Sequence, residues 1–461
     1  DAPAFARRDE RVSINPSSPW SSAFIENFMS FSLITLSAVI ITLGVIPFIW
    51  PRAIFEYPFV VGMLLSVWLL PQAWAVEREG LAGAFDPTET WIYMTLCMIF
   101  LCVGYVVGRK IGIQRAAKRQ ATLALMYNER RMTHASIVLI MIGAVAYVLM
   151  QRTVATTVYQ GGWTGIIIVY AMLSLCLVFA AALSFLIFLR TKSKPALILF
   201  IIATAIYLPI LLVSVRREYI FNFGVIILGG LFLVKRFVPP RALLLAFCLI
   251  GGFIVNRAGD LRGYVHDNDS SLIGALTSAE VLTGGYGGMS GTKAAEVTGA
   301  VTDIAIASEL GEYHPFVGIY NGMVSRYFPA FIFGRDAKNA LSIDAEEANP
   351  LSNRAQSNGA TRTGFSDTFT DFWYFGVLAF VSLGVFFGWL YSFAIAGGLR
   401  DQYLFVSLLG GGLHAFTHGY QEFICSLPFM LLIIWLPFRY ARVSKAERAR
   451  LETFRQVQPA S

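Results

Sequence analysis

The chain has 461 residues, of which 56% are hydrophobic and only 14% are charged. A soluble protein of this length could not bury so many apolar side chains, so the composition excludes a soluble globular fold. The formal net charge of +7 is attributed to Lys and Arg in cytoplasmic loops, and no nucleic-acid partner is expected.

Continuous apolar runs, rather than alternating strand patterns, predict an all-α polytopic integral membrane protein with about 11–12 transmembrane helices. The spans are expected at 27–50, 58–76, 90–107, 134–150, 163–189, 195–215, 219–234, 242–256, 372–397, 402–416 and 422–438. These divide the chain into an N-terminal tail (1–26), eight helices (27–256), a large loop (257–371), the C-terminal helices (372–438) and a cytoplasmic tail (439–461). All five cysteines lie inside apolar runs, so no disulfide framework, metal site or cofactor is expected.

The orientation follows from segment 108–133, where seven Lys and Arg residues accompany the single acid Glu129. The positive-inside rule assigns that segment to the cytoplasm. Alternation then puts the link 77–89, the turn 216–218 and the segment 257–371 outside. It also puts the N-terminus outside, although the arginines near residue 10 favour the opposite side.

An arginine doublet, Arg216–Arg217, lies at the non-cytoplasmic junction of spans 195–215 and 219–234. Two adjacent guanidinium groups on that side are unexpected from topology and suggest a bound phosphate, whose oxygens match the Arg fork. The later arginines on this side are Arg257, Arg262, Arg326, Arg335, Arg354 and Arg362. Together they could hold a lipid-linked pyrophosphate without a metal. Alternatively, each arginine snorkels to lipid headgroups or pairs with a nearby acid.

The outer segment 257–371 carries 8 basic and 14 acidic residues and is too long for a simple connector, which indicates a functional loop. Short helices are expected near 292–308 and 311–328. Within it, His314 or Glu312 could deprotonate a hydroxyl acceptor, unless His314 is an ordinary surface histidine.

Three tyrosines of the same segment, Tyr264, Tyr313 and Tyr320, are candidates for stacking on sugar rings. An interfacial aromatic belt is the alternative, and it also suits Trp373 and Tyr374.

Three polar residues near the C-terminal end, His414, His418 and Glu422, are spaced four apart and would share one face of a helix. They could line a polar cavity, whereas the lack of an H-E-x-x-H pattern weakens a metal site. The D-N-D at 267–269 is too short and common to establish a metal-dependent glycosyltransferase. The chain contains no Walker A, Rossmann or nucleophile-elbow motif, which removes support for ATP-driven transport and nucleotide-sugar chemistry.

From about residue 160 to 438 the chain resembles the Wzy-type oligosaccharide repeat-unit polymerases of bacterial O-antigen and exopolysaccharide assembly, with the xanthan-type polymerases as a candidate subgroup. The resemblance lies in the layout of the large loop and in three stretches: "SVRREY" (214–219), "VSRYFPAFIFGRDAKN" (324–339) and "GFSDTFTDFWYFGVLAFVSLGVFFG" (364–388).

The resemblance implies a GT-C-like polymerase–ligase architecture in the bacterial inner membrane, with a periplasmic loop and active site. It implies a metal-independent inverting glycosyl transfer, in which a growing chain on undecaprenyl pyrophosphate is the donor and a lipid-linked repeat unit is the acceptor. Arg216 and Arg217 would hold the pyrophosphate, with Arg257, Arg262 or Arg326 completing the clamp. His314 or Glu312 would be the acceptor base.

The expected partners are undecaprenyl-pyrophosphate-linked oligosaccharides and membrane lipids, with a chain-length regulator (co-polymerase) and a flippase as possible protein partners. An O-antigen ligase, which shares the layout, is the nearest alternative. A flippase or transporter of lipid-linked oligosaccharides is the non-enzymatic one, although intramembrane ionisable residues, which a proton-coupled carrier usually needs, are scarce here.

Overall fold

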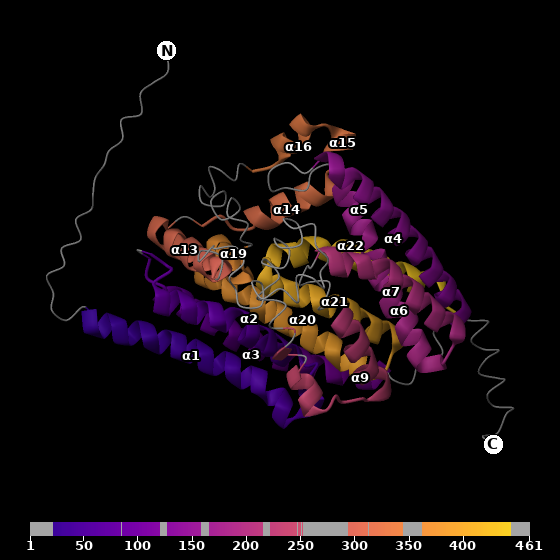
Figure 1. The fold of residues 1–461 in the computed structure, drawn as a ribbon, viewed down its shortest axis with the longest axis horizontal. Coiled ribbons are helices and arrows are strands. Elements are labelled where there is room, and N and C mark those ends of the chain that lie inside the picture. Colours follow the sequence, from indigo (N-terminus) through magenta and orange to yellow (C-terminus); the bar gives the residue numbers. More distant parts are fainter. Residues whose placement is uncertain are drawn as a thin grey trace, which may run out of the picture.

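The computed structural model is helical throughout nearly all of the residues it describes (Figure 1). These residues are 22–83, 85–119, 127–157, 166–214, 222–246, 248–249, 251, 294–311, 313–343 and 362–443. Within them, the extended structure is limited to one isolated bridge between Tyr127 and Arg442. The predicted all-α polytopic class is therefore confirmed.

The first part of the chain forms helices, most of them long, that follow the expected apolar runs. They are α1 (Ser22–Ile49), α2 (Tyr57–Glu79), α3 (Thr88–Arg119), α4 (Glu129–Thr157), α5 (Ile166–Ser174), α6 (Cys176–Thr191), α7 (Lys194–Ser214), the π-helical turn η3 (Val225–Gly229) and α9 (Gly230–Lys235). Helices α5 and α6 together form one candidate membrane span, Ile166–Thr191.

The second part begins with short helices and ends with long ones. They are α13 (Ala295–Leu310), α14 (Val317–Tyr327), α15 (Ala330–Phe333), α16 (Arg335–Leu341), α19 (Gly364–Phe372), the 3-10 turn η4 (Trp373–Gly376), α20 (Val377–Ile395), α21 (Leu399–Thr417) and α22 (Tyr420–Tyr440). The expected helices near 292–308 and 311–328 are confirmed as α13 and α14. A left-handed Gly311 ends the first, and the second starts only after a left-handed Phe316.

Seven helices of the described chain are long and apolar enough to cross a membrane, and two shorter apolar helices cover Lys194–Leu208 and Asn222–Lys235. The expected span 402–416 is occupied by α21, whose first turn carries Arg400, Asp401 and Gln402. This helix is packed inside the bundle instead of facing lipid, since most of its residues are buried. Of the expected span 242–256, the structure describes only 242–246, 248–249 and 251.

The span expected at 372–397 begins earlier, at Gly364. Helix α19 precedes it, and the Thr363 side chain caps that helix by accepting a hydrogen bond from the Ser366 amide at 3.2 Å. Phe365 and Phe369 are fully buried on this helix. Residues 364–371, which were expected to close the outer loop, therefore belong to the packed bundle.

Helices α3 and α20 lie side by side with their backbones almost touching (Figure 1). A Cβ added at Gly104 or Gly108 of α3 would meet the carbonyl oxygen of Val381 or Val385 at 2.2 or 2.1 Å. The approach is equally close at Gly384 of α20, where an added Cβ would meet a carbonyl oxygen of α3 at 2.3 Å. Small residues four apart on both helices permit this approach, as in packed membrane helices.

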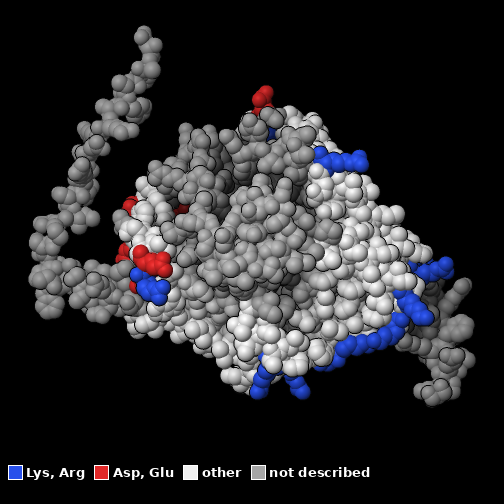
Figure 2. Space-filling view, viewed as in Figure 1, with Lys and Arg blue, Asp and Glu red and all other residues white. Residues whose placement is uncertain are grey.

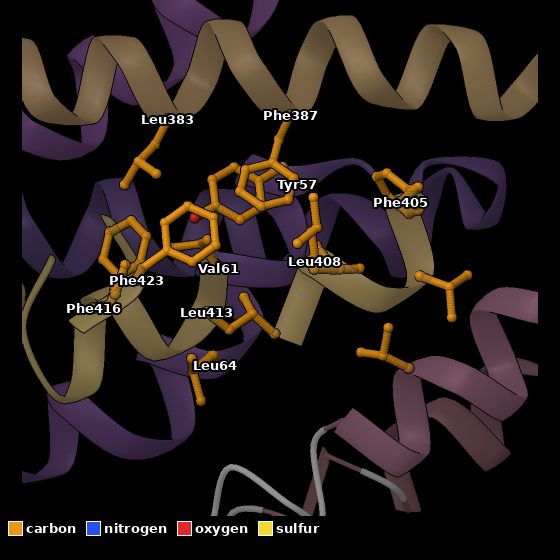
Figure 3. Packing of buried hydrophobic residues seen from close by; sticks show 14 of the residues in the cluster. Tyr57, Val61, Leu64, Leu383, Phe387, Phe405, Leu408, Leu413, Phe416 and Phe423 are labelled. Carbon is orange, nitrogen blue, oxygen red and sulfur yellow. The ribbon is translucent and has the colours of Figure 1, made fainter. Parts of the chain in front are cut away.

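Aromatic side chains fill the centre of the bundle, between α2, α20, α21 and α22 (Figure 3). The ring of Tyr57 stacks on Phe387 at a centroid distance of 4.1 Å, and its hydroxyl donates to the Gly412 carbonyl at 2.7 Å. Phe416 and Phe423 close the cluster. This region is a solid apolar core whose buried hydroxyl is satisfied.

One end of the bundle, here named the basic end, is defined by Arg109, Arg190 and Arg236. Figure 2 shows Lys and Arg gathered along the lower and right edges of the molecule. Arg236 donates to the carbonyl of Ile395 at 2.7 Å, and Arg190 donates to the side chain of Gln402 at 2.7 Å. The first of these places a cation at the C-terminal end of α20, where the helix dipole favours it.

An ion pair also lies at the basic end, because the half-exposed Arg109 donates to the buried carboxylate of Glu56 at 2.8 Å. Burial raises the pKa of Glu56 and the Arg109 charge opposes that rise. Since α3 runs from Thr88 to Arg119, its opposite end, near Glu89, is about 30 Å away from Arg109. The candidate site lies at that opposite end.

Candidate functional site

Helix α19 brings two aspartates to one face at the end of the bundle opposite the basic end. Asp367 and Asp371 are four residues apart, which places them one turn from each other on a helix. Asp367 is 4% exposed and Asp371 is 6% exposed. Ionised carboxylates are rarely buried to this degree without partners, so their surroundings decide what they can do.

A single arginine lies between two buried carboxyl groups. Arg362 Nε is 3.4 Å from Asp303 Oδ2 on α13, and Arg362 Nη1 is 3.9 Å from Asp367 Oδ1. These contacts are ionic rather than well-formed hydrogen bonds: Nε and Nη2 of Arg362 and Oδ1 of Asp367 have no hydrogen-bond partner among the described residues. We name Asp303, Asp367, Asp371 and Arg362 the acid cluster.

The acid cluster carries three carboxyl groups for one guanidinium, so full ionisation would leave excess negative charge in a buried site. Burial raises the pKa of Asp303, and the Arg362 charge opposes that rise. Protonation of one or more carboxyls would relieve the desolvation cost. Coupled carboxyls of this kind can store and release a proton.

The start of α22 supplies the partners of Asp371. The Tyr420 hydroxyl donates to Asp371 Oδ2 at 2.9 Å, and Gln421 Nε2 lies 3.4 Å from the same oxygen. Gly419 precedes them at φ +98°, and a Cβ there would meet Asp367 Oδ2 at 2.1 Å. Glycine is required at this position both by the backbone angle and by the closeness of the carboxylate.

The predicted base His314 lies next to the acid cluster. Its Nε2 atom is buried without a hydrogen-bond partner among the described residues, and the ring is within electrostatic reach of the Asp371 carboxyl. Its neighbour Tyr313 packs against Trp373 at a centroid distance of 5.8 Å and against Phe369 at 6.3 Å. The turn before α14 is thereby held over α19.

The predicted pyrophosphate ligand Arg326 is engaged in an ion pair. It contacts the Glu422 carboxylate and the Ser426 hydroxyl, and donates to the Glu422 carbonyl at 2.8 Å. This matches the alternative in which the arginine pairs with an acid. A phosphate bound here would have to displace Glu422 from Arg326.

The predicted common face of His414, His418 and Glu422 is wrong, because the chain breaks between two helices at Gly419. The rings of His414 and His418 do stack, with centroids 4.1 Å apart. Glu422 lies on the next helix and turns to Arg326. Among the described residues, no group of three or more His, Cys, Asp or Glu side chains is arranged to hold a metal ion.

The remaining predicted residues divide into two groups. Tyr320 is described and lies on α14 with 42% of its surface exposed. The others lie outside the described residues: Arg216, Arg217, Arg257, Arg262, Tyr264 and Glu312.

Sequence reasoning missed the acid cluster itself, although Arg362 was one of the arginines singled out. The spacing of Asp367 and Asp371 in "GFSDTFTDF" could have revealed one half of it, because residues four apart share a helix face. Asp303 gave no such signal, since its approach to α19 depends on tertiary packing. Comparison with family models, curated proteins and solved structures finds no match to this chain.

Proposed function

We propose that this protein is a membrane-embedded glycosyltransferase that polymerises oligosaccharide repeat units carried on undecaprenyl pyrophosphate, by an inverting transfer without a metal. The observation that supports it most directly is His314, whose buried Nε2 atom has no hydrogen-bond partner among the described residues and whose ring is within electrostatic range of the Asp371 carboxyl. A histidine with an unpartnered ring nitrogen beside a carboxyl is suited to accept a proton from a sugar hydroxyl. The carboxyl stabilises the imidazolium that forms.

In this proposal the acid cluster serves the acceptor sugar. A pyrophosphate would be repelled by three carboxyl groups that share one arginine. Hydroxyl groups, by contrast, donate readily to carboxylates and accept from a guanidinium whose Nε and Nη2 atoms lack hydrogen-bond partners among the described residues. The donor pyrophosphate is assigned instead to Arg216 and Arg217, with Arg257 or Arg262 as further ligands.

The proposed site faces the periplasm. Support comes from the basic end, which carries Arg109, Arg190 and Arg236, and which the positive-inside rule assigns to the cytoplasm. The acid cluster, on α13 and α19, lies at the opposite end of the bundle. Lipid-linked sugars exposed on the outer face of a bacterial inner membrane would meet the cluster there.

The central core favours an enzyme over a flippase. A carrier needs a polar route along the bundle, whereas the middle of the described bundle is filled by Tyr57, Phe387, Phe416 and Phe423. Polar groups collect at one end instead. An O-antigen ligase would share the same acceptor chemistry, and product length distinguishes it: a ligase transfers once to an outer-core acceptor, and a polymerase yields a ladder.

The test compares His314→Gln and Asp371→Asn with the wild type, using a lipid-pyrophosphate-linked repeat unit as substrate. Loss of the general base is expected to lower the rate by about 10²–10⁴-fold, with the smaller loss for Asp371→Asn. Glu309→Gln, an exposed carboxyl on α13, is the matched control and should retain the wild-type rate. A His314→Gln protein that is folded and fully active would refute the base assignment.

A further inference from the structure

An apolar turn lies uncovered on the outside of the bundle, in the segment between α14 and α16. Phe331, Ile332 and Phe333 of α15 are 50%, 62% and 50% exposed. Phe333 also stacks on Phe328 at a centroid distance of 4.1 Å, which fixes the turn. Three consecutive exposed apolar residues are unusual on a water-facing surface.

The depth of this turn is fixed by α22, a candidate membrane span. Helix α14 runs along its first turns: Gly318 abuts Gln421, Gly322 abuts Cys425, and the Tyr327 hydroxyl donates to the Cys425 carbonyl at 2.7 Å. Cys425 is five residues from the start of α22, or about 7–8 Å along the axis. The C-terminal end of α14 therefore lies deeper in the bilayer than the N-terminus of α22.

The exposed surface of α22 continues the apolar surface deeper into the bilayer, with Leu431, Leu432, Trp435 and Leu436 about 40–50% exposed. The next helix after the turn is polar: Asp336 of α16 is exposed, and Lys338 donates to the Ser325 carbonyl at 3.1 Å. An apolar turn followed directly by charged residues is the pattern of a segment that lies in the membrane interface.

We propose that Phe331–Phe333 is a wedge inserted among the acyl chains of the leaflet on the side of the α22 N-terminus. The wedge secures α14 in the interface, and α14 begins three residues after His314. The site is thereby held at the membrane surface, where a lipid-linked substrate would present its headgroup. This proposal requires only that α22 spans the bilayer. It does not depend on the proposed glycosyltransferase function.

The test places a spin label at position 332 in a cysteine-free chain (Ile332→Cys), reconstituted in phospholipid nanodiscs. Leu436→Cys, in the C-terminal half of α22, is the lipid-facing reference, and Asp336→Cys is the aqueous one. A label in acyl chains collides with dissolved oxygen more than with a water-soluble nickel chelate, so position 332 should behave like position 436.

Two outcomes would overturn the proposal. Behaviour like position 336 would place the turn in water, and low accessibility to both agents would mean that a second copy or another protein covers it. If the cysteine-free chain fails to fold, Ile332→Trp in the native background replaces the label. The fluorescence that the new Trp adds to that of the parent protein should be quenched by brominated phospholipid and not by iodide. Quenching by iodide and not by brominated phospholipid would overturn the proposal.

Discussion

At the scale of single residues, two opposing effects act on the carboxyls of the acid cluster: burial disfavours their ionised form, and the Arg362 guanidinium favours it. Asp303 is 5% exposed and depends on Arg362 for its counter-charge. Burial is the larger effect on the pKa of Asp303. The folded protein therefore prefers to keep a proton on a carboxyl that the unfolded chain would release.

This preference predicts a pH dependence of stability. Because the folded pKa of Asp303 is raised above its ordinary value of 3.8, its contribution is fully present below about pH 4 and is lost as the pH rises through the raised value. Asp303→Asn, which cannot ionise, should flatten this part of the profile. The measurement is the thermal unfolding midpoint in nanodiscs from about pH 4 to pH 8. Glu309→Gln is the exposed control on α13, and an unchanged slope in Asp303→Asn would contradict the prediction.

The same residues mark the limit of what the sequence could predict about the site. His314 was identified because it is a scarce residue type in a long outer segment, and the structure places it within electrostatic range of Asp371. Asp303 was passed over because nothing local distinguishes it from other acids of the segment 257–371, and the four-residue spacing of Asp367 and Asp371 was not recognised as one face of a helix. Their significance comes from burial and convergence, which only the packing of α13 on α19 creates.

At the scale of elements, the boundaries that sequence predicted well are those set by local composition. The runs at 27–50 and 58–76 became α1 and α2 because apolar length is a property of the segment itself. Helix α19 was assigned to the loop because its Ser, Thr and Asp residues lower its hydropathy. These side chains face the protein interior, where hydroxyls donate to carbonyls of the same helix.

The contact between α3 and α20 predicts a sharp dependence on glycine. Gly108→Ala and Gly384→Ala each introduce a Cβ within 2.4 Å of a carbonyl oxygen on the other helix. Neither backbone can yield easily, so we expect each to lower the free energy of unfolding by about 1–3 kcal/mol. Reversible denaturation in mixed detergent micelles measures it.

A matched control is available in Gly299 of α13, whose added Cβ has nothing within 4 Å. Alanine there should be neutral or stabilising by up to about 1 kcal/mol, because glycine is the poorer helix former. Equal effects at Gly108 and Gly299 would show that the close approach of α3 and α20 is not the cause.

At the scale of the whole molecule, charge divides the two ends of the bundle. The Arg236 guanidinium binds a carbonyl at the C-terminal end of α20, which belongs to the basic end. The carboxyls of Asp303 and Asp371 lie at the other end of the bundle. A membrane protein with this asymmetry is expected to insert with its basic end in the cytoplasm. Helices α13 and α14 and the acid cluster are then expected outside the cytoplasm.

The orientation can be measured by labelling intact cells with a membrane-impermeant maleimide. Asp336→Cys on α16 should react before permeabilisation, and Lys118→Cys near the end of α3 should react only afterwards. Both positions are exposed, so a difference reports sidedness rather than burial. The reverse pattern would place the acid cluster in the cytoplasm and remove the periplasmic site from the proposal.

The central claim is that purified protein forms glycosidic bonds between lipid-linked repeat units without a metal. The direct measurement incubates it with a synthetic undecaprenyl-pyrophosphate-linked repeat unit in the presence of EDTA, and compares wild type with Arg216→Ala plus Arg217→Ala. We predict a ladder of products from the wild type and none from the folded double variant. Absence of a ladder from the wild type, together with movement of the same lipid across liposome bilayers, would contradict the polymerase and establish a flippase.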